Sequence, residues 1–95
     1  MRAYEVMYIL KPDLEEEQRT QIVERINSIV IDGGGEVAEM NPWGLKRLAY
    51  EIDDYREGYY VVLKFQAEHA VAREMDRVLK ITDGVLRHMI LRLDQ

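Results

Sequence analysis

Apolar and polar positions alternate between strand-like and helix-like periods along the first third of the chain. Residues 2–10, RAYEVMYIL, are rich in β-forming side chains and predict a strand. Pro12 and Asp13 end it, and Asp13 with Glu16 three residues later has the spacing of a helix capping box. The helix predicted next has one apolar face, made by Ile22, Val23, Ile26, Ile29 and Val30. It ends at the glycines 33–35, because glycine adopts the left-handed conformation that closes a helix.

The middle of the chain predicts two strands joined as a hairpin. Residues 36–52 are predicted to form a long strand that bends at Asn41-Pro42, and this part belongs at a sheet edge or a bulge because proline cannot donate a ladder hydrogen bond. The polar segment DDYREG, residues 53–58, predicts the turn. YYVVLKFQ, residues 59–66, has the strongest strand character in the sequence.

The last third predicts a helix and a final strand. The helix covers about residues 68–82, and its apolar stripe consists of Val71, Met75, Val78, Leu79 and Thr82. Asp83-Gly84 turns the chain into a strand over residues 85–93. Both sets of alternate positions in this strand are apolar, so its pattern leaves open which set faces the helices.

This order of elements predicts an α+β protein with the ferredoxin-like βαββαβ fold, as one domain over residues 1–95. Two right-handed strand–helix–strand units interleave into one four-stranded antiparallel sheet with both helices on one face. The first and third strands are expected in the centre and the second and fourth at the edges. The other face of the sheet is then free for partners.

Composition narrows the classes of function. The chain has 47% hydrophobic and 33% charged residues, which is typical of a globular protein, and no stretch long and apolar enough to cross a membrane. It has no cysteine, which excludes thiolate metal sites and a cysteine nucleophile. The net charge of −5 argues against delocalised nucleic-acid binding, leaves room for a local basic patch and favours a basic protein as partner.

Candidate catalytic and metal-binding residues are sparse. Ser28 is the only serine and is predicted to lie on the surface of the first helix. His69 and His88 are far apart in sequence and do not have the spacing of metal ligands. The acidic runs correspond to a helix start and a turn, so no pair of carboxylates is expected to converge in a dry pocket. We therefore predict neither an enzyme nor a metal or cofactor site.

Positive charges within predicted strands are the remaining chemical signal. These are Arg2, Lys46, Arg47, Arg87 and Arg92. Such charges either keep a sheet edge from pairing with another chain or meet phosphates through charge-assisted hydrogen bonds. Trp43 and Tyr50 flank the Lys46-Arg47 pair, where they either stack on bases or a partner's apolar side chains, or simply pack on the sheet.

Three segments carry a resemblance to a known family. MRAYEVMYILKPDL opens the chain, GLKRLAYEI follows a helix that ends in glycines, and GYYVVLKF comes next. Together they resemble the bacterial small-subunit ribosomal protein number six family over nearly the whole chain. The resemblance implies a ferredoxin-like fold, no enzymatic activity and a cytoplasmic location in the small ribosomal subunit. It also implies binding to the central domain of the small-subunit rRNA, as a heterodimer with a small basic ribosomal protein, number eighteen.

The resemblance accounts for an acidic protein that binds RNA, because a basic partner supplies much of the phosphate neutralisation. It also implies that the positive charges on the predicted strands bind RNA or the protein partner. We expect RNA contacts from Arg2, Lys46, Arg47, Tyr50, Arg87 and Arg92. We expect partner contacts from Trp43, Leu45 and His88.

Two other classes of function fit the fold. A regulatory or ligand-sensing module would self-dimerise and bind a ligand at the sheet, but it leaves Lys46 and Arg47 unexplained. An acyl-phosphate hydrolase would need an arginine in an anion-binding loop after the first strand. The segment KPDLEEE that occupies this place is acidic.

Overall fold

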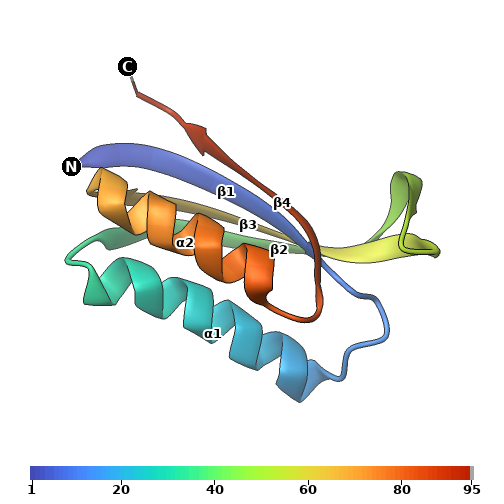
Figure 1. Ribbon diagram of the computed structural model, residues 1–95. Helices are drawn as coiled ribbons and strands as arrows, with labels where there is room; N and C mark the ends of the chain where they lie inside the picture. The colour runs from blue at the N-terminus through green and yellow to red at the C-terminus, as the bar shows by residue number, and fades with distance from the viewer. Residues whose placement is uncertain (95) are drawn as a thin grey trace.

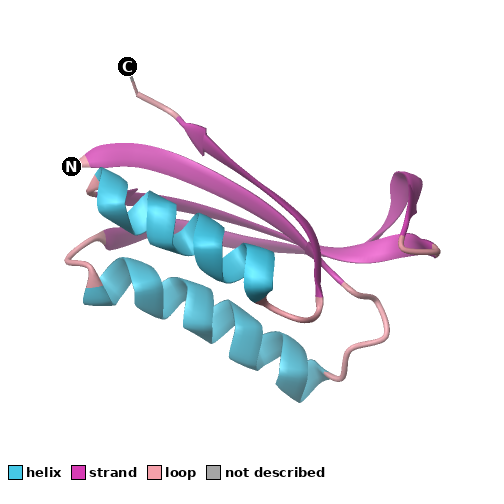
Figure 2. Ribbon diagram, in the orientation of Figure 1, coloured by secondary structure: helices cyan, strands magenta, loops and turns pink. Residues whose placement is uncertain are grey.

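Two helices lie against one face of a four-stranded antiparallel sheet (Figure 1). The computed structural model describes residues 1–94. All strands form one layer and both helices the other (Figure 2). The elements are β1 (Arg2–Leu10), α1 (Glu16–Asp32), β2 (Glu36–Ile52), β3 (Tyr55–Ala67), α2 (His69–Ile81) and β4 (Val85–Arg92).

The sheet order is β2-β3-β1-β4, with every neighbouring pair antiparallel. The first and third strands are therefore central and the second and fourth are edges, which confirms the predicted ferredoxin-like fold. Each strand–helix–strand crossover skips one position in the sheet, so β3 lies between β1 and β2, β1 lies between β3 and β4, and the two units interleave.

The hydrophobic core lies between the helices and the covered face of the sheet. Alternate residues of β1 point into it, and Tyr4, Val6, Tyr8 and Leu10 are all buried. The helices contribute the predicted stripes, among them Ile26 and Val30 from α1 and Met75 and Leu79 from α2. Each fully buried large apolar side chain contributes about 1.5–3 kcal/mol relative to exposure.

Helix α1 begins two residues later than the sequence pattern predicts. The N-cap is Glu15, and the backbone N–H of Glu15 donates to the side-chain oxygen of Gln18 at 3.0 Å. The predicted box of Asp13 and Glu16 is wrong, because the Asp13 carboxylate instead accepts a hydrogen bond from the Tyr55 hydroxyl at 3.3 Å. A tertiary contact to the hairpin thus occupies the side chain that the local pattern assigned to the cap.

The end of α1 agrees with the prediction. Gly34 has φ +80°, the left-handed conformation, and the Gly35 N–H donates to the carbonyl of Val30 at 2.8 Å. The glycine triplet therefore closes the helix and starts β2.

The hairpin between β2 and β3 is tighter and longer than predicted. Its turn is only Asp53-Asp54, with φ values of 50° and 69°, and β3 already begins at Tyr55. The predicted turn over residues 53–58 is wrong because two consecutive left-handed residues close a two-residue hairpin, and aspartate tolerates this conformation. The distal part of the hairpin extends beyond the helices and bends away from them (Figure 1).

The predicted bend in β2 is a bulge. The pairing register shifts between Pro42 and Gly44, and Gly44 has φ +84°. The extra residue, Trp43, consequently points to the same side as Gly44 and its pairing partner Tyr60.

Pairing settles the facing of β4. His88 pairs with Tyr8 and Ile90 with Val6, and because directly opposed residues share a face, these β4 side chains lie on the helix side. Arg87, Met89 and Leu91 lie on the open face. Two boundaries differ slightly from prediction, since α2 ends at Ile81, before Thr82, and β4 ends at Arg92.

Candidate nucleic-acid interface

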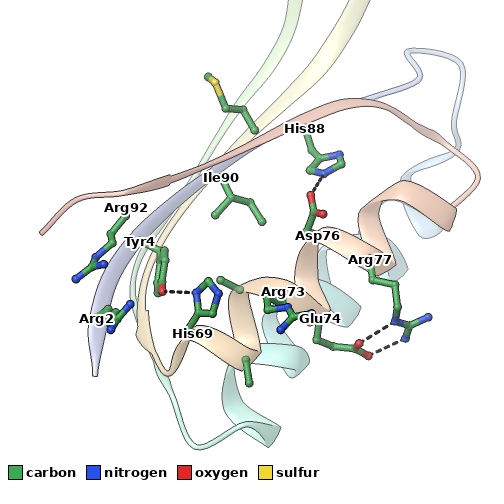
Figure 3. Close-up of a pocket in the computed structure, with 13 residues that line it drawn as sticks. Arg2, Tyr4, His69, Arg73, Glu74, Asp76, Arg77, His88, Ile90 and Arg92 are labelled. Atoms are coloured by element: carbon green, nitrogen blue, oxygen red, sulfur yellow. Dashed lines mark hydrogen bonds and ion pairs between the residues drawn. The ribbon is translucent and has the colours of Figure 1, made fainter. Parts of the chain in front are cut away.

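A groove runs between the β1–β4 edge of the sheet and helix α2 (Figure 3). Its volume is about 850 Å³. Of the predicted site residues, Arg2, His88 and Arg92 line it, each from the helix side of its strand. The structure therefore brings two predicted RNA-binding arginines together with a residue predicted to bind the partner.

Helix α2 adds basic residues to the groove that sequence reasoning missed. Arg73, Arg77 and His69 line the same groove. From the sequence, only cations on predicted strands were singled out, although the spacing of four between Arg73 and Arg77 already places both on one side of the helix. The sequence pattern could not predict that this side of α2 lies beside the end of β4.

Two carboxylates in the groove are already engaged. Glu74 accepts two hydrogen bonds from Arg77, both at 2.8 Å, and Asp76 lies 2.7 Å from Nε2 of His88. The hydrogen bond from Arg77 lowers the pKa of Glu74 below its ordinary value. The hydrogen bond from His88, with a second from Lys80, lowers the pKa of Asp76. The side chain of His88 is therefore paired with Asp76 of the neighbouring helix.

The groove keeps an excess of positive charge. Its lining contains four arginines and only two carboxylates, Glu74 and Asp76. Arg92 pairs with Asp94 at 3.1 Å, outside the lining. Arg2 and Arg73 form no ion pair with any of residues 1–94. Two free guanidiniums on opposite walls can donate to the oxygens of a phosphate backbone.

A second cluster lies on the open face at the start of the distal hairpin. Trp43 stacks on Tyr60, with ring centroids 6.3 Å apart and planes inclined by 12°. The ammonium group of Lys46 lies 5.9 Å from the centroid of the Trp43 ring, within the range of a cation–π contact. Trp43 is 52% exposed, so one face of this stack is accessible.

Arg87 of β4 and Tyr50 of β2 meet on the open face. The Arg87 guanidinium donates a hydrogen bond to the Tyr50 hydroxyl and lies 5.8 Å from the centroid of its ring. These two predicted RNA-binding residues are therefore engaged with each other, and together they join the curled hairpin to the far edge of the sheet.

Leu45 and Arg47 lie on the opposite side of β2 from the Trp43 cluster. Leu45 pairs with Tyr59, whose ring lies 4.5 Å below the guanidinium of Arg19 in α1, and Arg47 pairs with Glu57. Both side chains are exposed. The predicted partner-binding set of Trp43, Leu45 and His88 thus does not converge on one surface.

Residues 1–94 hold no group of three or more histidine and acidic side chains arranged to bind a metal ion. No helix within the same residues has the length and apolar character needed to span a membrane.

Comparison with known proteins shows that this chain is similar to the members of one family. The family model described as ribosomal protein S6 matches residues 3–92. The small ribosomal subunit protein bS6 of Desulforudis audaxviator is 65% identical over 94 residues, covering 99% of this chain and all of its own. That of Thermoanaerobacter pseudethanolicus is 50% identical over the full length of both chains.

A solved structure agrees with these matches. The crystal structure of 30S ribosomal protein S6 from Thermotoga maritima superposes with a TM-score of 0.90 at 30% identity, covering 96% of this chain and 86% of the other. The family match, the relatives and this structure together show that the chain belongs to the ribosomal protein S6 family, whose members are non-enzymatic proteins of the small ribosomal subunit.

Proposed function

We propose that this protein binds the central domain of the small-subunit rRNA together with the small basic ribosomal protein number eighteen, as a heterodimer. As a member of the S6 family it is a component of the cytoplasmic ribosome and not an enzyme. Its contribution is structural, so the chemistry to be explained is recognition of RNA and of a protein partner.

The groove between β4 and α2 is the observation that supports RNA binding best. Arg2, Arg73 and Arg92 come from three different elements and surround it. Guanidinium groups recognise phosphate oxygens in bidentate geometry, and contacts of this kind set the register of a protein on nucleic acid. We assign the phosphate backbone to this groove.

The exposed cations of the hairpin form a second position for phosphates. Lys46 and Arg47 point to opposite sides of β2, and neither forms an ion pair with another of residues 1–94. Charges that only keep an edge strand from pairing would serve equally well with either sign. Lys46 and Arg47 are positive because they contact phosphate groups of the RNA.

The net charge supports the need for a basic partner. At −5, the field of the whole chain opposes the approach of RNA, so local arginines alone give weak binding. A basic protein bound to the same molecule neutralises this field and adds its own phosphate contacts.

Charge reversal in the groove tests the proposal. We expect the variant Arg2→Glu with Arg73→Glu to keep its circular dichroism spectrum, because both side chains are exposed. In filter binding with the basic partner and a central-domain rRNA fragment, it should bind more than tenfold more weakly. The slope of log affinity against log salt should fall by about 0.7–0.9 for each phosphate that the variant no longer neutralises.

The matched variant Lys46→Glu with Arg47→Glu reverses the same charge on the hairpin. We expect it to stay folded and to fail to join the complex of partner and RNA. Normal incorporation of both variants, with unchanged salt slopes, would contradict RNA binding at these positions. Wild-type protein that binds the rRNA with nanomolar affinity in the absence of the partner would contradict the heterodimer.

A further inference from the structure

Both histidines of the chain line the groove between β4 and α2 (Figure 3). They come from different elements, since His69 begins α2 and His88 lies in the middle of β4. Histidine ordinarily changes its charge between pH 5 and 8, whereas arginine stays positive throughout this range. The positive charge of the groove therefore has a fixed part from arginine and a part that depends on pH.

The charge of His88 is balanced within the protein. Its Nε2 atom lies 2.7 Å from a carboxylate oxygen of Asp76, and its side chain is only 14% exposed. Hydrogen bonds from His88 and Lys80 lower the pKa of Asp76, so this carboxylate is charged at neutral pH. Protonation of His88 therefore completes an ion pair with Asp76, and the ring nitrogen that faces the carboxylate is not available to a ligand.

His69 has no counter-charge of this kind. It is exposed and forms no ion pair with any of residues 1–94. Its Nδ1 atom lies 3.4 Å from the hydroxyl of Tyr4. A hydroxyl donates to a neutral imidazole and accepts from a protonated one, so Tyr4 orients the ring in both states. The other ring nitrogen, Nε2, is then left to donate to a ligand in the groove.

Tyr4 is a rigid support for this imidazole. Its ring stacks on Phe65 with centroids 5.4 Å apart, and only 4% of the residue is exposed. The central strand β1 holds it from both sides, because Tyr4 pairs with Phe65 of β3 and with Arg92 of β4. Directly opposed residues share a face of the sheet, so Tyr4 presents the imidazole on the same side as Arg92.

Within residues 1–94, the charged groups around His69 leave no carboxylate unpaired. Arginines of three elements line the groove with it, namely Arg2 of β1, Arg73 of α2 and Arg92 of β4. Each carboxylate that lines the groove or adjoins its lining has a cationic partner, and the pairs are Glu68 with the N-terminal amine, Glu74 with Arg77, Asp76 with His88 and Asp94 with Arg92. The counter-charge of a protonated His69 must therefore come from a bound anion.

We propose that His69 is a further phosphate-contacting residue of the groove, positioned by Tyr4, and that its protonation strengthens the binding of RNA there. This rests on the proposed function and deepens it, because it names the residue that makes RNA binding depend on pH. A bound phosphate favours the charged imidazole, and by reciprocity the charged imidazole favours the phosphate. Formation of the complex is then coupled to the uptake of up to about one proton by His69.

The dependence of RNA binding on pH tests this contact. In filter binding with the basic partner and a central-domain rRNA fragment, we expect the affinity of the wild type to rise about fivefold from pH 8 to pH 6. His69→Gln keeps a polar side chain without the charge and should lose most of this rise. His69→Lys carries a fixed charge, so it should bind at pH 8 about as tightly as the wild type does at pH 6.

His88→Gln is the matched control, since it removes the other histidine of the same groove. Glutamine still donates to Asp76, and we expect the variant to keep the relative rise in affinity between pH 8 and pH 6, measured against its own affinity at pH 8. The N-terminal amine, the partner and the RNA titrate in the same way in every variant. Differences in pH dependence between the variants therefore report on the histidines.

Removing the hydroxyl of Tyr4 tests how the imidazole is positioned. Tyr4→Phe keeps the aromatic ring stacked on Phe65 and loses the contact to His69. We expect binding at pH 6 to weaken about twofold. The same variant should have no effect in a chain that already carries His69→Gln, because the two changes remove one interaction. Equal effects of Tyr4→Phe in both chains would show that Tyr4 does not act through His69.

The outcomes separate this inference from the proposed function. If the wild type binds the RNA with its partner and His69→Gln, folded by circular dichroism, keeps the full rise in affinity, the contact is wrong and the groove keeps its role. If the rise disappears only in His88→Gln, the pH dependence belongs to the pair with Asp76 and the inference is again wrong. If the wild type with its partner does not bind the RNA at any pH, the proposed function is wrong as well.

Discussion

The two faces of the sheet use similar apolar residues in different ways. On the covered face Val6 and Leu63 are fully buried beneath the helices, whereas on the open face Met89 and Leu91 are each 45% exposed. In each strand, successive residues point to opposite faces of the sheet, and apolar residues occur at positions that face either way. The helices bury the covered face, whereas the open face is buried only in part, for example at Ile9, which is 5% exposed. Exposed open-face residues such as Met89 and Leu91 contribute to a surface for partners more than to the stability of the monomer.

The faces also differ in how they treat polar groups. On the covered face the Tyr8 hydroxyl is buried and has no hydrogen-bond partner within residues 1–94. This burial raises the pKa of Tyr8 above its ordinary range. On the open face Lys46 and Arg87 keep their charges in solvent and against aromatic rings. A buried polar group therefore destabilises the covered face, whereas charge is tolerated on the open face.

The largest expected effect comes from truncating a leucine of α2 that packs against the covered face and, for comparison, a leucine on the open face. Leu79→Ala removes a side chain that is 1% exposed and should lower the free energy of unfolding by about 2–5 kcal/mol. Leu91→Ala on the open face should change it by no more than about 0.5 kcal/mol. Urea denaturation measures both. Equal losses would mean that the open face is part of the core of the monomer.

A smaller effect, of opposite sign, is expected from Tyr8→Phe. Removing a buried hydroxyl without a partner relieves its desolvation cost, so the free energy of unfolding should rise by about 1 kcal/mol. Tyr60→Phe on the open face, where the side chain is half-buried, serves as the control and should be neutral. Destabilisation of more than about 1 kcal/mol by Tyr8→Phe would show that the hydroxyl is hydrogen-bonded after all.

The smallest expected effect concerns pH in the groove at the border of the two faces. Hydrogen bonds from His88 and Lys80 lower the pKa of Asp76 below its ordinary value of 3.8. The unfolded chain therefore takes up this proton first as pH falls. The stability that Asp76 contributes is present above about pH 3.8 and is lost as pH falls through its lower folded pKa.

Thermal unfolding of the wild type and Asp76→Asn at several pH values measures this contribution. The variant should be slightly less stable at pH 6, and the difference should shrink as the pH falls below 3.8. It should stay small because the Asp76 side chain is 43% exposed and screened by solvent. A difference that persists at pH 2 would assign the effect of the substitution to packing.

The local pattern of residues was sufficient for the order of elements and the arrangement of the sheet. Residues 2–10 were correctly predicted as a strand, and the apolar stripe around Met75 and Leu79 correctly predicted a helix packed on the sheet. Pro42 predicted a sheet edge or a bulge, and β2 is an edge strand whose pairing register shifts beside this residue. Such features depend on periodicity, proline and glycine, whose conformational preferences act within a few residues.

Tertiary structure decided the features that depend on contacts between distant segments. The Asp13 carboxylate accepts a hydrogen bond from Tyr55 instead of capping α1. Pairing with β1 determines which side of β4 faces the helices.

The groove forms because β1 and α2 place Arg2 and Arg73 on its walls. Ile9 of β1 lies beside Leu48 and Ile52 of the hairpin and is buried although it is on the open face. The sequence predicted Arg2 as a charged strand residue but could not predict its neighbours, because which side chains meet depends on register and curvature. Both are set by the packing of the whole sheet.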